Sequence, residues 1–72
     1  MTKKEYLRKL GAQIRKVREQ KGYSQDRVHL EGDLSRATMS RIESGLVDAQ
    51  AYTLKRIADT INVPVKKFFE FD

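Results

Sequence analysis

The chain has 72 residues and a mass of 8.4 kDa, which suits one small domain and is too short for two separate cores. It contains no cysteine and one histidine, so disulfide bonds, thiolate metal sites and multi-histidine metal sites are excluded. No apolar run approaches the roughly 20 residues of a membrane-spanning helix, and no secretory segment begins the chain. We therefore expect a soluble, cytoplasmic domain without metal or cofactor, stabilised by helix packing or self-association.

Positive charge is concentrated at the start of the chain. The whole sequence carries 15 Lys and Arg against 10 Asp and Glu, a net charge of +5. Residues 1–27 hold nine basic and three acidic side chains, whereas residues 28–54 hold two basic and four acidic ones. A basic segment favours a polyanionic partner, nucleic acid before a membrane, although basic surfaces also serve solubility alone.

The first predicted helix follows Thr2, because Thr2 and Glu5 have the spacing of a capping box. Gly22 suits the end of this helix, since glycine adopts the left-handed conformation without a Cβ clash. Gly11 weakens the helix by about 1 kcal/mol relative to alanine and indicates a close approach of another segment. Apolar residues at steps of three and four form one stripe: Leu7, Leu10, Ile14 and Val17.

Two short helices are expected next, each preceded by a serine that can cap it. Ser24 is the cap of the first of these helices, over residues 25–31. Ser35 is the cap of the second, over residues 36–44. A tight turn connects them, with the sequence Gly32-Asp33-Leu34. Two short helices joined by such a turn form a helix-turn-helix unit, which spans about residues 25–44.

The last part of the chain is expected to form a fourth helix and a short fifth one. Asp48 is the candidate cap of the fourth helix, whose apolar stripe is Leu54, Ile57, Ala58 and Ile61. Asn62 suits the position after this helix, and Pro64 begins a last helical turn. Phe68 and Phe69 in that turn are expected in the core. The predicted fold is therefore all-α, with five helices around one core.

A set of residues spread along these helices forms a known pattern: Leu10-Gly11, Ile14-Arg15, Arg18, Gly22, Ser24-Gln25, Val28, Leu34-Ser35-Arg36, residues 39–45, Leu54, Ile57-Ala58 and residues 63–69. In this combination residues 10–69 resemble the helix-turn-helix domain of Cro and lambda repressor, the XRE family of bacterial and phage regulators. The resemblance implies that residues 1–72 form a compact, lambda-repressor-like domain that binds double-stranded DNA. The second helix of the helix-turn-helix unit would then enter the major groove.

The resemblance also implies which residues contact DNA. Four residues of the second unit helix fall on base-facing positions: Arg36, Ala37, Ser40 and Arg41. Gln25 falls on a phosphate-contacting position, and Ser24, Ser35 and Thr38 are further candidates for contacts with DNA. Arginine binds guanine O6 and N7 with two hydrogen bonds, which contribute about 1–3 kcal/mol of discrimination. The alternative is that the arginines form an ordinary solvated face and that Gln25 bonds only water.

By the same resemblance, Arg18 and Glu43 form a structural salt bridge between the first and third helices. Two positions depart from the family pattern, because His29 replaces alanine and Asp33 replaces glycine. We expect His29 to be half-buried and hydrogen-bonded, and Asp33 to keep the turn, since aspartate tolerates the left-handed conformation. The loop over residues 46–50 lacks the family's basic residues, so it either contributes little to DNA affinity or contacts a protein.

Two functions remain open on the sequence. The first is a sequence-specific transcriptional regulator, a repressor or controller that reads a palindromic operator as a homodimer. The dimer would form through the C-terminal segment, with the loop at residues 46–52 as a second candidate region; Phe71 is either part of that contact or a frayed end. The second is an antitoxin-like or other protein-interaction module with weak or partner-dependent DNA binding. We reject an enzyme, because the sequence has no Gly-rich phosphate loop and no cysteine nucleophile.

Overall fold

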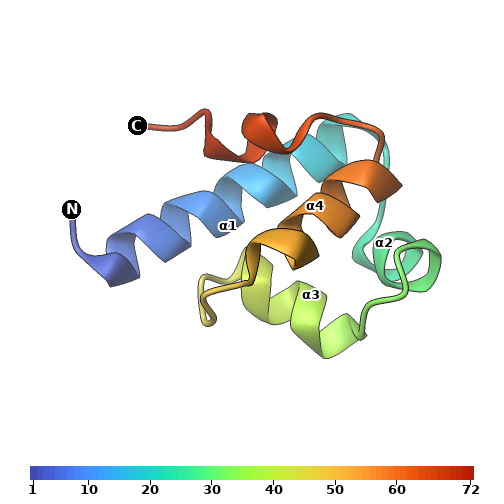
Figure 1. Ribbon diagram of the computed structural model, residues 1–72, viewed down its shortest axis with the longest axis horizontal. Helices are drawn as coiled ribbons and strands as arrows, with labels where there is room; N and C mark the ends of the chain where they lie inside the picture. Colours follow the sequence, from blue (N-terminus) through green and yellow to red (C-terminus); the bar gives the residue numbers. More distant parts are fainter.

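The computed structural model describes all residues 1–72 as four α-helices and one 3-10 helix, which Figure 1 shows in chain order. The elements are α1 (Lys3–Gln20), α2 (Gln25–Glu31), α3 (Arg36–Glu43), α4 (Ala51–Thr60) and the 3-10 helix η1 (Val65–Phe69). Helix α1 packs against α3 and η1, while α2 packs against α3 and α4. The all-α prediction is confirmed. The prediction of five helices is confirmed for the first four, whereas the fifth helical segment is a 3-10 turn.

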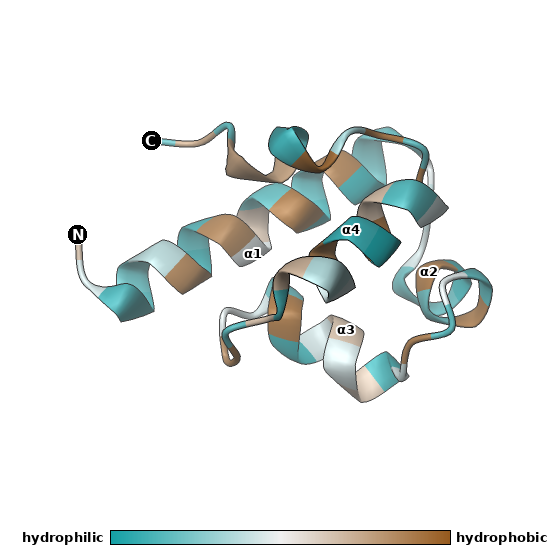
Figure 2. Ribbon diagram, viewed as in Figure 1, coloured by the Kyte–Doolittle hydropathy of each residue, from teal (hydrophilic) through white to brown (hydrophobic).

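Helix α1 begins and ends as its sequence predicts. The backbone N–H of Glu5 donates to Thr2 Oγ1 at 3.1 Å, and the backbone N–H of Thr2 donates to Glu5 Oε1 at 3.4 Å. After the helix, Gly22 has a φ of 79°. In Figure 2 the ribbon of α1 changes repeatedly between hydrophilic and hydrophobic colours along the helix. No helix of the chain combines the length and the apolar character needed to cross a membrane.

Helices α1 and α3 approach each other closely at Gly11. A Cβ atom at this position would lie 2.5 Å from the carbonyl oxygen of Ile42 and 2.6 Å from that of Glu43. Because both atoms belong to the backbone, no side-chain rotation relieves the clash. The close approach predicted at Gly11 is confirmed, and it explains why a residue unfavourable to helices stands inside α1.

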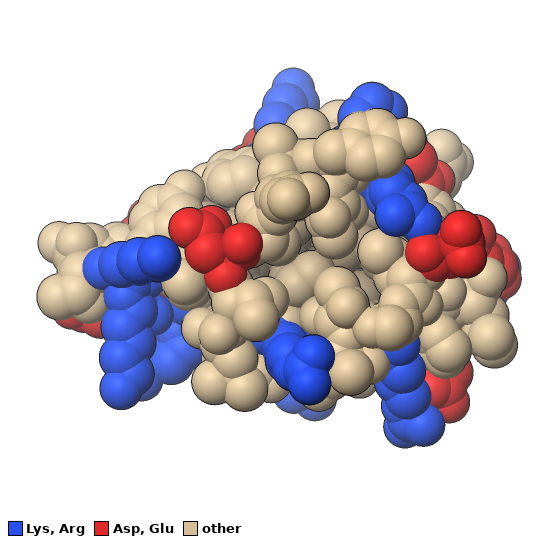
Figure 3. All heavy atoms as spheres, turned by 60° about the horizontal axis from the view of Figure 1, so that its bottom comes forward, with Lys and Arg blue, Asp and Glu red and all other residues tan.

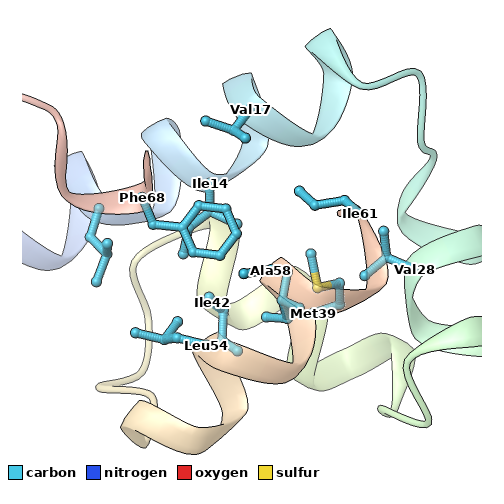
Figure 4. Packing of buried hydrophobic residues seen from close by; sticks show 11 residues of the cluster. Ile14, Val17, Val28, Met39, Ile42, Leu54, Ala58, Ile61 and Phe68 are labelled. Carbon is cyan, nitrogen blue, oxygen red and sulfur yellow. The ribbon is translucent and has the colours of Figure 1, made fainter. Parts of the chain in front are cut away.

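One cluster of eleven buried hydrophobic side chains joins all five elements: Leu10, Ile14, Val17, Val28, Met39, Ile42, Leu54, Ile57, Ala58, Ile61 and Phe68. Figure 4 shows the ring of Phe68 pointing from η1 into the middle of this cluster. The prediction that Phe69 is also in the core is wrong, since 43% of Phe69 is exposed whereas Phe68 is fully buried. Neighbouring residues of a 3-10 helix point about 120° apart, so only one of the two rings faces the core.

The C-terminal segment turns back along α1 after η1. The backbone N–H of Lys67 donates to Pro64 O at 3.0 Å, a bond that closes a 3-10 turn. The carbonyl oxygen of Lys67 accepts a bond from Gln13 Nε2 of α1 at 3.0 Å. Beyond this point Phe71 packs edge-on against Tyr6, with ring centroids 5.3 Å apart. Phe71 is half-buried, so its interpretation as a frayed end is wrong.

Helix α4 holds the turn between α2 and α3. Asp33 has a φ of 55°, so the left-handed conformation expected of aspartate at this position is confirmed. Arg56 Nη2 of α4 donates to the carbonyl oxygens of Gly32, at 2.8 Å, and Asp33. A Cβ atom on Gly32 would lie 2.7 Å from Thr60 Oγ1, so the absence of a side chain allows α4 to approach the turn.

Two predictions about single polar residues have opposite outcomes. His29 is half-buried and donates from Nδ1 to the carbonyl oxygen of Leu34 at 3.2 Å, as expected. The prediction that Asp48 caps the fourth helix is wrong. The N-cap of α4 is Gln50, which makes no side-chain capping bond, and the Asp48 carboxylate lies 3.7 Å from Lys3 Nζ. Because α4 begins at Ala51, Asp48 stands two residues before the capping position.

Candidate nucleic-acid interface

Helix α3 has one buried face and one exposed face. Met39 and Ile42 are buried in the core, as their spacing predicts. The four residues expected at base-facing positions are exposed together on the other side: Arg36, Ala37, Ser40 and Arg41. Ala37 and Ser40 are small, so the two arginines are the long side chains of this face. The exposed face of α3 therefore presents two cations on a narrow, otherwise uncharged surface.

The two capping serines hold the ends of α2 and α3 beside this face. Ser24 Oγ accepts the backbone N–H of Arg27 at 3.0 Å, which leaves the hydroxyl hydrogen of Ser24 available. Ser35 Oγ accepts the backbone N–H of Thr38 at 3.0 Å and donates to Thr38 Oγ1 at 2.6 Å. The hydroxyl groups of Ser35 and Thr38 thus stabilise the first turn of α3.

A buried ion pair lies where α1 and α3 meet. Arg18 Nε donates to Glu43 Oε2 at 2.6 Å, and Arg18 Nη2 donates to Glu43 Oε1 at 2.9 Å. Arg18 Nη1 also donates to the carbonyl oxygen of Tyr23 at 2.7 Å. The exposed fractions of the two side chains are 7% and 3%. The hydrogen bonds to Glu43 raise the pKa of Arg18, so the buried guanidinium keeps its charge.

The side chain of Gln25 joins this ion pair to the start of α2. Its Nε2 donates to Glu43 Oε1 at 2.9 Å. Since a carboxylate only accepts hydrogen bonds, Glu43 fixes which end of the amide faces inward. Gln25 is half-buried, and its second N–H remains available to an acceptor outside the protein. The position expected to contact phosphate is therefore set by the buried pair.

The two arginines of α3 differ in their surroundings. Arg36 Nε lies 3.2 Å from Asp26 Oδ1 of α2, and 70% of the Arg36 side chain is exposed. Arg41 is exposed and makes no ion pair. Sequence reasoning did not find the partner of Arg36, because Asp26 stands ten positions earlier and the contact depends on the crossing of α2 and α3. The turn contacts of Arg56 were missed for the same reason, since no local spacing links α4 to that turn.

A separate apolar surface lies over α4 and η1. A groove of about 410 Å³ is lined by Ala51, Tyr52, Leu54, Lys55, Val65 and Phe69. An adjoining groove reaches α1 and shares Ala51, Leu54 and Phe69 with the first. Of the lining residues, Tyr52 is 69% exposed and Val65 is 38% exposed. Figure 3 shows a largely uncharged, hollowed face with both basic and acidic side chains around it.

Comparisons with known proteins agree with this arrangement. The helix-turn-helix family HTH_3 matches residues 14–68, about three quarters of the chain. The restriction-modification controller protein C.AhdI from Aeromonas hydrophila is similar in structure, with a TM-score of 0.83 and 24% identity over 88% of this chain and 96% of that one. None of the curated proteins compared with the chain matches it.

Two further solved structures are similar over most of their length. The wild-type restriction-modification controller protein C.Esp1396I has a TM-score of 0.79 and 29% identity over 90% of this chain and 86% of its own. The DNA-binding domain of BldD has a TM-score of 0.80 and 28% identity over 94% of this chain and 97% of that domain.

The buried pair predicts a large loss of stability when one partner is removed. Replacing Arg18 with alanine leaves the Glu43 carboxylate buried without its cation, which costs about 3–5 kcal/mol of the free energy of unfolding. Replacing Arg15 removes an exposed pair with Glu19, which contributes about 0–1 kcal/mol. Thermal unfolding followed by circular dichroism should therefore give a much lower Tm for Arg18→Ala than for Arg15→Ala. Equal, small decreases would contradict the structural role of the pair.

Proposed function

The chain belongs to the helix-turn-helix family HTH_3 and is a DNA-binding transcriptional regulator of the XRE type, and we propose that it reads a palindromic operator as a homodimer. The observation that carries the proposal is the exposed face of α3, with Arg36 and Arg41 on a surface otherwise made of small residues. The likeness to the controller protein C.Esp1396I at 29% identity favours a repressor or controller whose activity is occupancy of an operator.

In this proposal α3 lies in the major groove and α2 crosses the backbone. Arg36 and Arg41 bind base edges, and guanine is the preferred target because it offers two acceptors to one guanidinium. Ala37 and Ser40 contact the groove without blocking it. The free hydroxyl hydrogen of Ser24 and the remaining amide N–H of Gln25 donate to a phosphate at the start of α2. Ser35 and Thr38 act indirectly, since their hydroxyl groups hold the first turn of α3.

The dimer would form through the apolar surface over α4 and η1. Tyr52 at the start of α4 and Phe69 of η1 expose apolar rings beside Val65, and a second copy would remove them from water. Phe71 is engaged with Tyr6 in its own chain, so the C-terminal contribution comes from Val65 and Phe69. Because η1 packs on α1 and α4 rather than on α3, this surface leaves both recognition helices free. A two-fold axis here would allow them to reach half-sites about 34 Å apart.

The loop between α3 and α4 favours a second candidate function, the binding of a protein partner. Leu46 is 74% exposed in this loop, and the exposed Asp48 follows it by two residues. An exposed leucine next to an acidic residue suits a basic and apolar protein surface better than a phosphate backbone. An antitoxin-like module would use this loop while binding DNA weakly.

The proposal predicts that DNA binding depends on the two arginines of α3. In anisotropy titrations with a duplex pool of mixed sequence, the affinity of the unmodified protein should fall steeply as salt rises. Arg36→Ala/Arg41→Ala should bind about tenfold more weakly or worse at the same salt, because two cations leave the interface. Both side chains are exposed, so the Tm should change little.

The matched control is Lys66→Ala/Lys67→Ala, which removes the same charge from η1, an element that does not pack against α3. It should retain most of the affinity. Equal losses in the two double variants would indicate that only net charge matters and would contradict a binding face on α3. Binding that is absent at moderate salt would favour the protein-partner function.

The dimer proposal predicts self-association that depends on Tyr52. Sedimentation at tens of micromolar should show a dimer, and Tyr52→Glu should give a monomer, because a charge would be buried in the apolar contact. Leu30→Glu is the control, since Leu30 of α2 is 72% exposed and lies outside the groove. A protein that sediments as a monomer, and that also binds DNA as a monomer, would refute the dimer.

A further inference from the structure

Asp26 places a negative charge beside the face proposed to bind DNA. It lies in the first turn of α2, next to Gln25, and its side chain is 57% exposed. Its Oδ1 lies 3.2 Å from Arg36 Nε and 3.9 Å from His29 Nε2. An acidic side chain at this position repels the phosphate backbone of any duplex and so weakens binding to every sequence. We therefore expect a contact through which Asp26 contributes to DNA recognition.

The ion pair with Arg36 is such a contact. A guanidinium group is planar and carries five N–H donors. The ion pair draws the Nε side of this group toward Asp26, which favours one orientation of the guanidinium and leaves both terminal nitrogens without a hydrogen bond in the protein. These two nitrogens are the ones that can bind guanine O6 and N7 together. A free arginine with the same exposure would lose side-chain entropy on adopting that orientation, whereas the paired one has already lost part of it.

The position of Asp26 on another helix strengthens this effect. Asp26 belongs to α2, whose start is tied to the buried ion pair through the bond from Gln25 to Glu43. On its other side, His29 is held by a bond to the carbonyl oxygen of Leu34. The part of α2 that carries Asp26 is therefore held by bonds to α3 and to the turn.

Building on the proposed DNA-binding role of α3, we propose that Asp26 is a specificity-determining positioning residue, which orients the Arg36 guanidinium toward a guanine and raises discrimination at the expense of overall affinity. An acidic residue in the first turn of a helix also stabilises that helix. That effect changes the Tm and leaves the relative affinities for different sequences unchanged.

The test uses the full chain and the duplex that the unmodified protein selects from a randomised pool, compared with the same duplex changed at one base pair at a time. Asp26→Ala should bind the unselected pool about threefold more tightly, since a negative charge has left the interface. Its preference for the selected duplex should fall about tenfold, with the loss confined to one base-pair position in each half-site. Asp59→Ala is the matched control, because it removes an exposed, paired aspartate from α4.

Two comparisons make the outcome decisive. In an Arg36→Ala background, the further change Asp26→Ala should leave the sequence preference unchanged, because Asp26 acts through Arg36. An unchanged or increased preference in Asp26→Ala alone would overturn the proposal, as would an equal loss in Asp59→Ala. If the unmodified protein itself shows no preference for any duplex, the proposed operator reading fails and this inference fails with it.

Discussion

Arg18 and Glu43 meet at the point where α1, α3 and the start of α2 converge, and the orientation of the exposed face of α3 depends on that contact. Two buried charges lose their hydration, and this cost is offset only when their remaining hydrogen-bonding groups find partners. Here Tyr23 and Gln25 supply those partners, and no buried polar side-chain atom lacks a hydrogen bond. Because few arrangements satisfy all of these groups at once, the network fixes the crossing of the helices as well as joining them.

The turn of the helix-turn-helix unit depends on a second contact, from α4. Asp33 occupies a left-handed position that glycine would adopt at lower cost, and Gly32 leaves room where a side chain would meet Thr60. Arg56 binds the carbonyl oxygens that this turn exposes. The departure from the family pattern at Asp33 is therefore compensated by a side chain of α4, and the two helices of the unit remain in contact with each other and with the core.

The sequence was sufficient for most features that depend on neighbours within four residues, although it placed the cap of α4 at Asp48 and not at Gln50. The cap at Thr2, the caps at Ser24 and Ser35 and the inward direction of Ile42 follow from such spacing. Prediction from the sequence failed where contacts between distant segments determine the local structure. Phe69 is exposed because η1 is a 3-10 turn that packs on α1 and α4 with Phe68 as its buried residue.

The candidate site shows the same division. The residue types on α3 could be read from the sequence, since helical spacing places Arg36 and Arg41 away from Met39 and Ile42. The surroundings of these two arginines could not be read from the sequence. The pairing of Arg36 with Asp26 requires the angle between α2 and α3, and that angle results from the packing of the whole core.

Selection of bound duplexes from a randomised library would show whether α3 reads DNA bases within a symmetric dimer, as we propose. Selection should be run on the unmodified protein and on Arg36→Ala side by side at moderate salt. The account predicts a palindromic consensus with half-sites about one helical turn apart, and a loss of preference at one position of each half-site in the variant. Enrichment of no sequence, or a consensus identical in the two proteins, would contradict it.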